Sequence, residues 1–143
     1  MLVTKNLVIF ALGVVAVSPT KLSLENITDD FKAQLLKLHG LCSTETGATE
    51  EDIETLRKGI FTEDPKIKCY IKCNFLGIEL WTDNSEINPA PFANIVPAEM
   101  SKEVFTAYDD CNKKLGNIND LCEKSYMLIK CIHETALDSF FVV

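Results

Sequence analysis

The stretch CYIKC, residues 69–73, decides the fold. Two cysteines four residues apart on a helix project from the same face, one turn apart, with Cβ vectors that lean the same way. Such a pair is badly placed to form a bond with itself, so each cysteine is expected to bond to a different partner. Asp64 can cap the start of this helix, Pro65 suits its first position, and Gly77 can end it. One short helix would then be bonded covalently to two other parts of the fold.

The N-terminal segment is typical of a secretory signal peptide. Lys5 is followed by an unbroken apolar run of eleven residues, 7–17, which is too short to span a bilayer. We predict that residues 1–18 are removed, with cleavage between about Ala16 and Thr20, and that residues 19–143 form the mature domain. The alternative interpretation is a first core helix.

Charge and cysteine content restrict the class of protein. The 143 residues fit one domain and carry a net charge of −7, or −8 without residues 1–18, where Lys5 is the only charge. This acidic balance argues against binding to nucleic acid or to anionic membranes. Secretion implies an oxidising compartment, and six cysteines then predict three disulfides. Excluding a Cys69–Cys73 bond leaves twelve of the fifteen pairings open.

Apolar periodicity and capping residues predict further helices and no strand of useful length. Residues 81–92 are interpreted as a loop because prolines interrupt them, and Ile95 and Val96 as a short helical turn. Ile60 is expected to face inward at the end of the second helix. The expected helices run from Thr28 to about Leu41, from the Thr49–Asp52 capping box to Gly59, from Ser101 to Gly116, and from Asn119 or Asp120 past Ile132.

The chain ends in an apolar segment, residues 139–143. Exposing it would cost roughly 1.5–3 kcal/mol per large side chain, so we expect it to fold back over the domain. The sequence therefore predicts one all-α domain of five to six helices.

No arrangement of residues indicates an enzyme or a metal site. The histidines are His39 and His133 only, and bridged cysteines would leave no thiolate as nucleophile or zinc ligand. His39 lies three residues before Cys42, a spacing better explained by a surface histidine. The carboxylates cluster at helix starts, where the helix dipole accounts for them. We expect no catalytic residue, metal or cofactor. The excess of inward-facing apolar residues either packs as a solid core or surrounds a cavity.

The cysteine spacing resembles that of the general and pheromone-binding group of insect odorant-binding proteins. It reads Cys42-x26-Cys69-x3-Cys73-x37-Cys111-x10-Cys122-x8-Cys131, over essentially the whole mature chain. Residues 64–73 (Asp-Pro-x3-Cys-Tyr-x2-Cys) and 121–131 (Leu-Cys-Glu-Lys-x6-Cys) resemble the corresponding segments of that family. The resemblance implies three interlocked disulfides, Cys42–Cys73, Cys69–Cys122 and Cys111–Cys131, which brace a compact helical bundle around an apolar cavity.

The function implied by this resemblance is reversible carriage of a small apolar molecule, such as an odorant or pheromone, through aqueous sensory fluid. Carriage in reproductive, gland or venom fluid is the alternative on the same scaffold. A membrane olfactory receptor and a second copy of the chain are further implied partners. Tyr70 and Tyr126 are expected to supply polar contacts. By family position the ligand would contact Leu38, Phe75, Leu76, Leu80, Ile87, Ile95, Val96, Tyr126, Ile129 and Ile132, with Phe140, Phe141 and Val142 forming a lid or wall.

The resemblance also implies that acid releases the ligand near membranes. His39, His133 and Asp138 lie near plausible joints of the fold and are the candidate groups for such a switch. An affinity that is unchanged between pH 7 and pH 5 would rule this hypothesis out.

Overall fold

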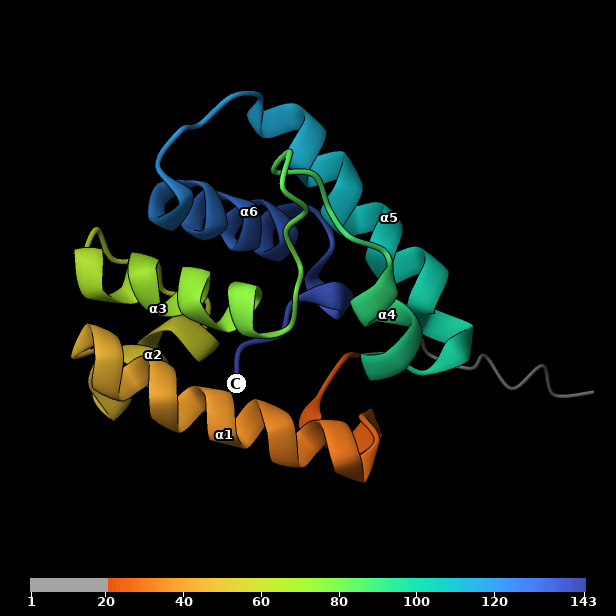
Figure 1. Cartoon of the computed structure of the whole chain (residues 1–143), viewed down its shortest axis with the longest axis horizontal. Helices are drawn as coiled ribbons and strands as arrows, with labels where there is room; N and C mark the ends of the chain where they lie inside the picture. The colour runs from red at the N-terminus through yellow and green to blue at the C-terminus, as the bar shows by residue number, and fades with distance from the viewer. Residues whose placement is uncertain (1–20) are drawn as a thin grey trace, which may run out of the picture.

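The computed structural model describes residues 21–143, so the predicted signal peptide, residues 1–18, and the domain start at residue 19 lie outside the described residues. The predicted all-α fold with about six helices is confirmed, and within this range the only β-type pairing is an isolated bridge between Trp81 and Ile87 (Figure 1). Among residues 21–143, no helix combines the length and apolar character that a membrane span requires. The elements are η1 Leu24–Asn26, α1 Asp29–Thr46, α2 Glu50–Arg57, α3 Pro65–Gly77, α4 Ala90–Ile95, α5 Ala98–Leu115, α6 Leu121–Thr135 and η2 Leu137–Ser139.

Three of the predicted helix starts are capped as expected. The Asp64 side chain accepts a hydrogen bond from the Lys66 backbone N–H and is followed by Pro65 at the start of α3. Thr49 and Asp52 form the reciprocal capping box of α2. Asp120, rather than Asn119, accepts from the Glu123 N–H at the start of α6. These local bonds satisfy backbone donors that a helix start leaves unpaired.

The first helix is longer than expected. It continues past Leu41 to Thr46 and ends at Gly47, whose φ of 74° is left-handed. The hydroxyls of Ser43, Thr44 and Thr46 donate to backbone carbonyls one turn earlier, which makes these polar residues compatible with a helix. Thr28 stands at the N-cap position, but its side chain makes no capping hydrogen bond.

The segment interpreted as a proline-rich loop contains a helix. Pro89 is the N-cap of α4 and Pro91 lies in its first turn, where no intrahelical N–H is required. The next helix starts at Ala98, after Pro97, instead of at Ser101. Ile60 is 55% exposed, because α2 ends at Arg57 and its apolar stripe does not reach that far.

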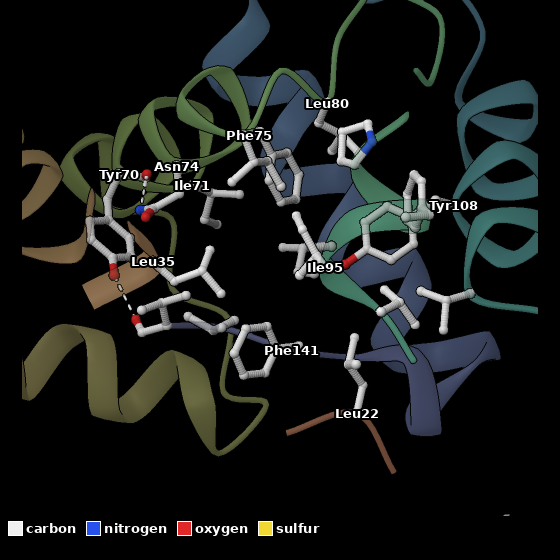
Figure 2. A pocket seen from close by; sticks show the side chains of 18 residues that line it. Leu22, Leu35, Tyr70, Ile71, Asn74, Phe75, Leu80, Ile95, Tyr108 and Phe141 are labelled. Atoms are coloured by element: carbon white, nitrogen blue, oxygen red, sulfur yellow. Dashed lines mark hydrogen bonds between the residues drawn. The ribbon is translucent and has the colours of Figure 1, made fainter. Parts of the chain in front are cut away.

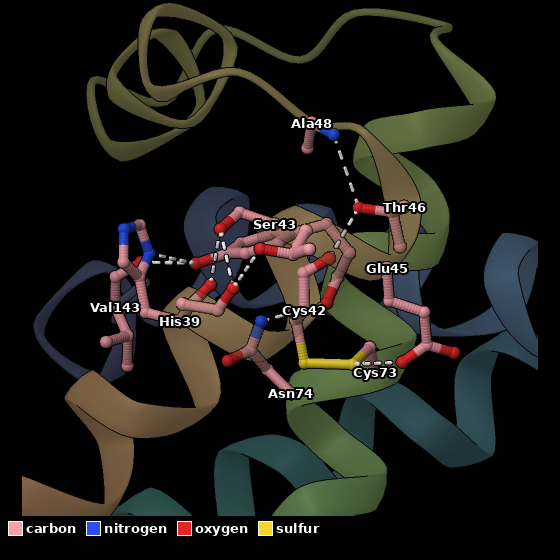
Figure 3. Close-up of a disulfide and its surroundings, with 12 residues drawn as sticks. His39, Cys42, Ser43, Glu45, Thr46, Ala48, Cys73, Asn74 and Val143 are labelled. Carbon is pink, nitrogen blue, oxygen red and sulfur yellow. Dashed lines mark hydrogen bonds between the residues drawn. A yellow bond between two sulfur atoms is a disulfide. The ribbon is translucent and has the colours of Figure 1, made fainter.

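The helix α3 is the centre of the structure, as its two cysteines suggest. It packs against α1 on one side and against α6 on the other (Figure 1). Cys42–Cys73 joins α1 to α3 (Figure 3), Cys69–Cys122 joins α3 to α6, and Cys111–Cys131 joins α5 to α6. These are the three pairs that the resemblance implies, and no cysteine among the described residues is free.

The C-terminal segment returns to the interior of the domain, as its apolar sequence predicts. Phe140 and Val143 are buried, and the C-terminus lies between α1 and α3 (Figure 1). The Leu22 N–H donates to the Asp138 carbonyl oxygen at 2.8 Å. This bond joins the start of the described chain to the η2 segment, from which the last residues continue towards α3.

Candidate functional site: an apolar cavity

The helices surround a partly open cavity, and none of the described residues that line it carries a charged side chain (Figure 2). The space open to the centre of a water-sized sphere is about 80 Å³. On this measure one water needs roughly 10–15 Å³, so the cavity holds a molecule of roughly five to eight heavy atoms. It is lined by Leu22, Leu35, Tyr70, Ile71, Asn74, Phe75, Ile78, Leu80, Pro91, Phe92, Ile95, Val96, Val104, Tyr108, Ile129, Phe141, Val142 and Val143.

The structure brings together part of the ligand-contact set that was expected by family position. The segment after α3, α4 and α6 all contribute expected residues, and the tail forms part of the wall as expected. The expected residues that line the cavity are Phe75, Leu80, Ile95, Val96, Ile129, Phe141 and Val142.

Three expected residues from α1, α3 and the following loop lie away from the cavity. The Leu38 side chain covers Gly77, where an added Cβ would approach its Cδ2 to 2.3 Å. Leu76 is 47% exposed on the outer face of α3. Ile87 is buried, but it pairs with Trp81 and does not reach the wall.

Three more expected residues are buried elsewhere in the core. Tyr126 and Ile132 lie three residues on either side of Ile129, and each three-residue step falls about 60° short of a full helical turn, so only Ile129 faces the cavity. Phe140 packs with its ring centre 4.8 Å from that of His133 and 6.2 Å from that of Phe61. These three residues therefore do not line the cavity described here, and their contact with a ligand stays a prediction.

Sequence reasoning missed the start of α4 and the contribution of α5 to the wall. Pro91 and Phe92 were assigned to a loop, although a proline pair at a helix start was the signal for α4. Val104 and Tyr108 share one predicted helix face, but periodicity assigns them only to a buried side, not to a cavity.

The Tyr70 hydroxyl lies at the cavity but is already bonded within the chain. It donates to the Val143 carbonyl oxygen at 2.6 Å, and His39 Nδ1 lies 2.8 Å from it. Burial raises the pKa of Tyr70 to about 12, so the phenol is neutral at physiological pH. Tyr70 therefore anchors the tail, and Tyr126 directs its hydroxyl to Glu63 at 3.4 Å instead of to the cavity.

Among the described residues, Asn74 is the only one in the cavity wall with an amide side chain. Its Nδ2 donates to the Tyr70 carbonyl oxygen at 2.9 Å, which fixes the orientation of the amide group. Its Oδ1 is buried and has no hydrogen-bond partner among the described residues. The backbone bond thus uses the amide donor, while the amide oxygen is closed off from the cavity space.

Charged groups hold the surrounding structure from outside the cavity. Lys124 is 5% exposed, and its Nζ donates to the Ser85 carbonyl oxygen at 2.8 Å and lies 5.0 Å from the centre of the Trp81 ring. Burial lowers the pKa of this amine. These contacts fix the loop that follows Leu80, while leaving the cavity wall itself uncharged.

Comparison with known proteins agrees with this architecture. The profile of the PBP/GOBP family matches residues 25–135. B1 protein of Tenebrio molitor is 31% identical over 118 residues, which are 77% of this chain and 84% of that protein. General odorant-binding protein 69a of Drosophila melanogaster is 27% identical over 99 residues, 68% of this chain and 66% of that protein.

Solved structures show the same fold. Odorant binding protein 5 of Apis mellifera superposes with a TM-score of 0.67 at 18% identity, over 87% of this chain and all of that chain. Odorant Binding Protein 7 of Anopheles gambiae, solved in complex with an azo compound, has a TM-score of 0.61 at 26% identity, over 79% of this chain and 93% of that chain. Fold and family are those of small-ligand carriers rather than enzymes. The chain belongs to the PBP/GOBP family of insect odorant-binding proteins.

Proposed function

We propose that this protein is a secreted carrier that binds a small apolar molecule reversibly and transports it through aqueous sensory fluid. The observation that carries the proposal is the cavity, which is lined mainly by apolar side chains and, within residues 21–143, by no charged side chain. Membership of the odorant-binding family supports it, since a relative of this fold was solved with a small organic ligand.

The cavity volume predicts weak and therefore reversible binding of a short ligand. Each buried methylene contributes about 0.8 kcal/mol, so a six-carbon chain gains about 5 kcal/mol and binds in the submillimolar range. A longer chain gains more only if the tail segment Phe141–Val143 moves to make room. The ligand is thus expected to be compact, or to displace the tail.

Secretion is supported by two independent features. Residues 1–18 are typical of a signal peptide, and the described domain contains three disulfides and no free cysteine. Disulfides of this kind persist in oxidising, extracellular compartments. The membrane receptor and the homodimer that the resemblance implies stay predictions.

The test is displacement of a fluorescent apolar probe by a homologous series of alcohols, aldehydes and alkanes. Val96→Phe should fill the cavity and abolish probe binding, while Leu76→Phe, on the outer face of α3, should leave binding unchanged. Circular dichroism confirms that both variants are folded. Undiminished probe binding by a folded Val96→Phe variant would contradict the proposal.

A further inference from the structure

Tyr108 lines the cavity, and neighbouring aromatic rings hold its side chain in place. The residue lies on α5 and is 6% exposed. Its ring meets the rings of Phe92 and Phe75 edge to face, at centroid distances of 5.3 and 6.3 Å. Figure 2 shows the hydroxyl oxygen directed inward, towards Ile95. These contacts orient the phenol without using its polar group.

The Tyr108 hydroxyl has no hydrogen-bond partner among the described residues, and yet it is not closed off as Asn74 Oδ1 is. It therefore borders the open space of the cavity. The other polar groups of the wall are committed, since Tyr70 bonds Val143 and the Asn74 amide donates to backbone. Leaving a buried hydroxyl unpaired costs free energy, which a ligand oxygen would recover.

We propose that the Tyr108 hydroxyl is the hydrogen-bond anchor for a ligand with one neutral oxygen, an alcohol, aldehyde or ketone of about six carbons. This inference rests on the proposed carrier function and names the ligand class of the same cavity. The remaining wall beside Tyr108 is apolar, so the hydrocarbon part of the ligand packs against Ile95, Val104 and their neighbours.

The same geometry disfavours an ionised carboxylate and gives a pure hydrocarbon no use of the hydroxyl. An ionised carboxylate would be buried with one hydroxyl donor and no cation, because Lys68 and Lys124 lie outside the wall, and that burial is strongly unfavourable. Burial raises the pKa of Tyr108, so the phenol stays protonated and donates to a neutral oxygen. A pure hydrocarbon fits the space but leaves the hydroxyl unpaired.

The experiment compares 1-hexanol, hexanal, hexane and hexanoate as competitors for a fluorescent apolar probe at pH 7.5. Hexanoate should bind the wild-type protein most weakly, and the wild-type affinities for hexanol, hexanal and hexane serve as the reference for the variants. Tyr108→Phe should weaken hexanol and hexanal by about threefold to tenfold and leave hexane unchanged. Tyr126→Phe, whose hydroxyl faces Glu63, is the matched control and should change none of these ratios.

The outcomes separate this inference from the proposed function. If the folded wild-type protein binds neither probe nor any competitor, the carrier function fails. If all competitors bind but Tyr108→Phe affects hexane and hexanol equally, or affects neither, carriage stands and the anchor assignment is overturned. Loss of hexanol binding but not hexanal binding in the variant would restrict the ligand to alcohols. Circular dichroism and thermal melting of both variants exclude misfolding as the cause.

Discussion

Gly59 shows how one residue joins a turn to the packing of α6. Its φ of 77° is left-handed, and a Cβ at this position would lie 2.1 Å from His133 Nε2. Gly59→Ala should therefore lower the free energy of unfolding by about 1–3 kcal/mol, measured by urea denaturation. The control is Gly40→Ala inside α1, where nothing lies within 4 Å and the change should be stabilising by about 0.5–1 kcal/mol. Equal effects of the two substitutions would contradict this explanation.

At the level of single residues, the sequence predicts caps better than it predicts cavity contacts. Asp64, Thr49 and Asp120 act on backbone groups two or three residues away, so their roles can be read locally. Tyr126 and Tyr108 are both buried tyrosines on α-helices, but only Tyr108 reaches the cavity. That difference depends on how α5 and α6 are rotated against their neighbours, which no local pattern encodes.

At the level of the elements, the Tyr70 hydroxyl of α3 holds the C-terminal segment. Two acceptors compete for its hydrogen, the Val143 oxygen and His39 Nδ1. His39 Nε2 lies 3.0 Å from Glu50 Oε2, so this nitrogen carries a hydrogen, and Nδ1 of the neutral ring is an acceptor. The single Tyr70 proton is then shared between His39 Nδ1 and the Val143 oxygen. When His39 is protonated, Nδ1 becomes a donor and the Tyr70 proton is free for Val143.

A protonated His39 ring would therefore tighten this anchor instead of releasing the tail, contrary to the acid release that the resemblance implies. Probe dissociation, measured by stopped flow, should not become faster when the pH is lowered from 7.5 to 5.5. Glu50 stays ionised in this range, because Arg57 and His39 hold the pKa of its carboxyl below the usual value. The prediction is contradicted if the probe dissociates faster at pH 5.5 than at pH 7.5 and if this acceleration is absent in His39→Gln. That result would show that His39 promotes release of the tail in acid.

The helices themselves were predicted well where their ends carry strong signals. The extra turn of α1 was missed because Ser43, Thr44 and Thr46 favour turns as isolated residues, whereas here their hydroxyls bond the helix backbone. A short helical turn was expected at Ile95 and Val96, but the start of α4 was assigned to a loop because Pro91 disfavours helix interiors, although it is compatible with a first turn. In both cases the position of a residue within the element, rather than its type, determined the result.

For the whole molecule, the disulfides differ in the length of chain that they close. Cys69–Cys122 spans 53 residues and Cys111–Cys131 spans 20. In the chain-entropy treatment, replacing each pair by alanines should lower the unfolding free energy by about 4 and about 3 kcal/mol, respectively. Urea denaturation under non-reducing conditions measures both values. A larger loss from the shorter loop would show that native contacts, rather than loop closure, determine the effect.

The cysteine spacing, through the resemblance that it carries, implied both the bundle and its apolar cavity, whereas apolar periodicity alone indicated the helices but not the cavity. Periodicity identifies Ile129 and Ile132 equally as buried, and only the packed structure shows that Ile129 faces open space. Whether a domain of this size has a hollow or a solid centre depends on how the side chains of several helices meet. Such contacts join residues far apart in the chain and leave no periodic signal.

The wall of the cavity has a consequence for biosynthesis. Leu22, near the beginning of the described chain, and Val143 belong to the same wall. During synthesis, a chain whose residues 141–143 are still inside the ribosome lacks one side of that wall, even if its earlier helices have already formed. The cavity can therefore close only after these residues have emerged and packed against the rest of the domain.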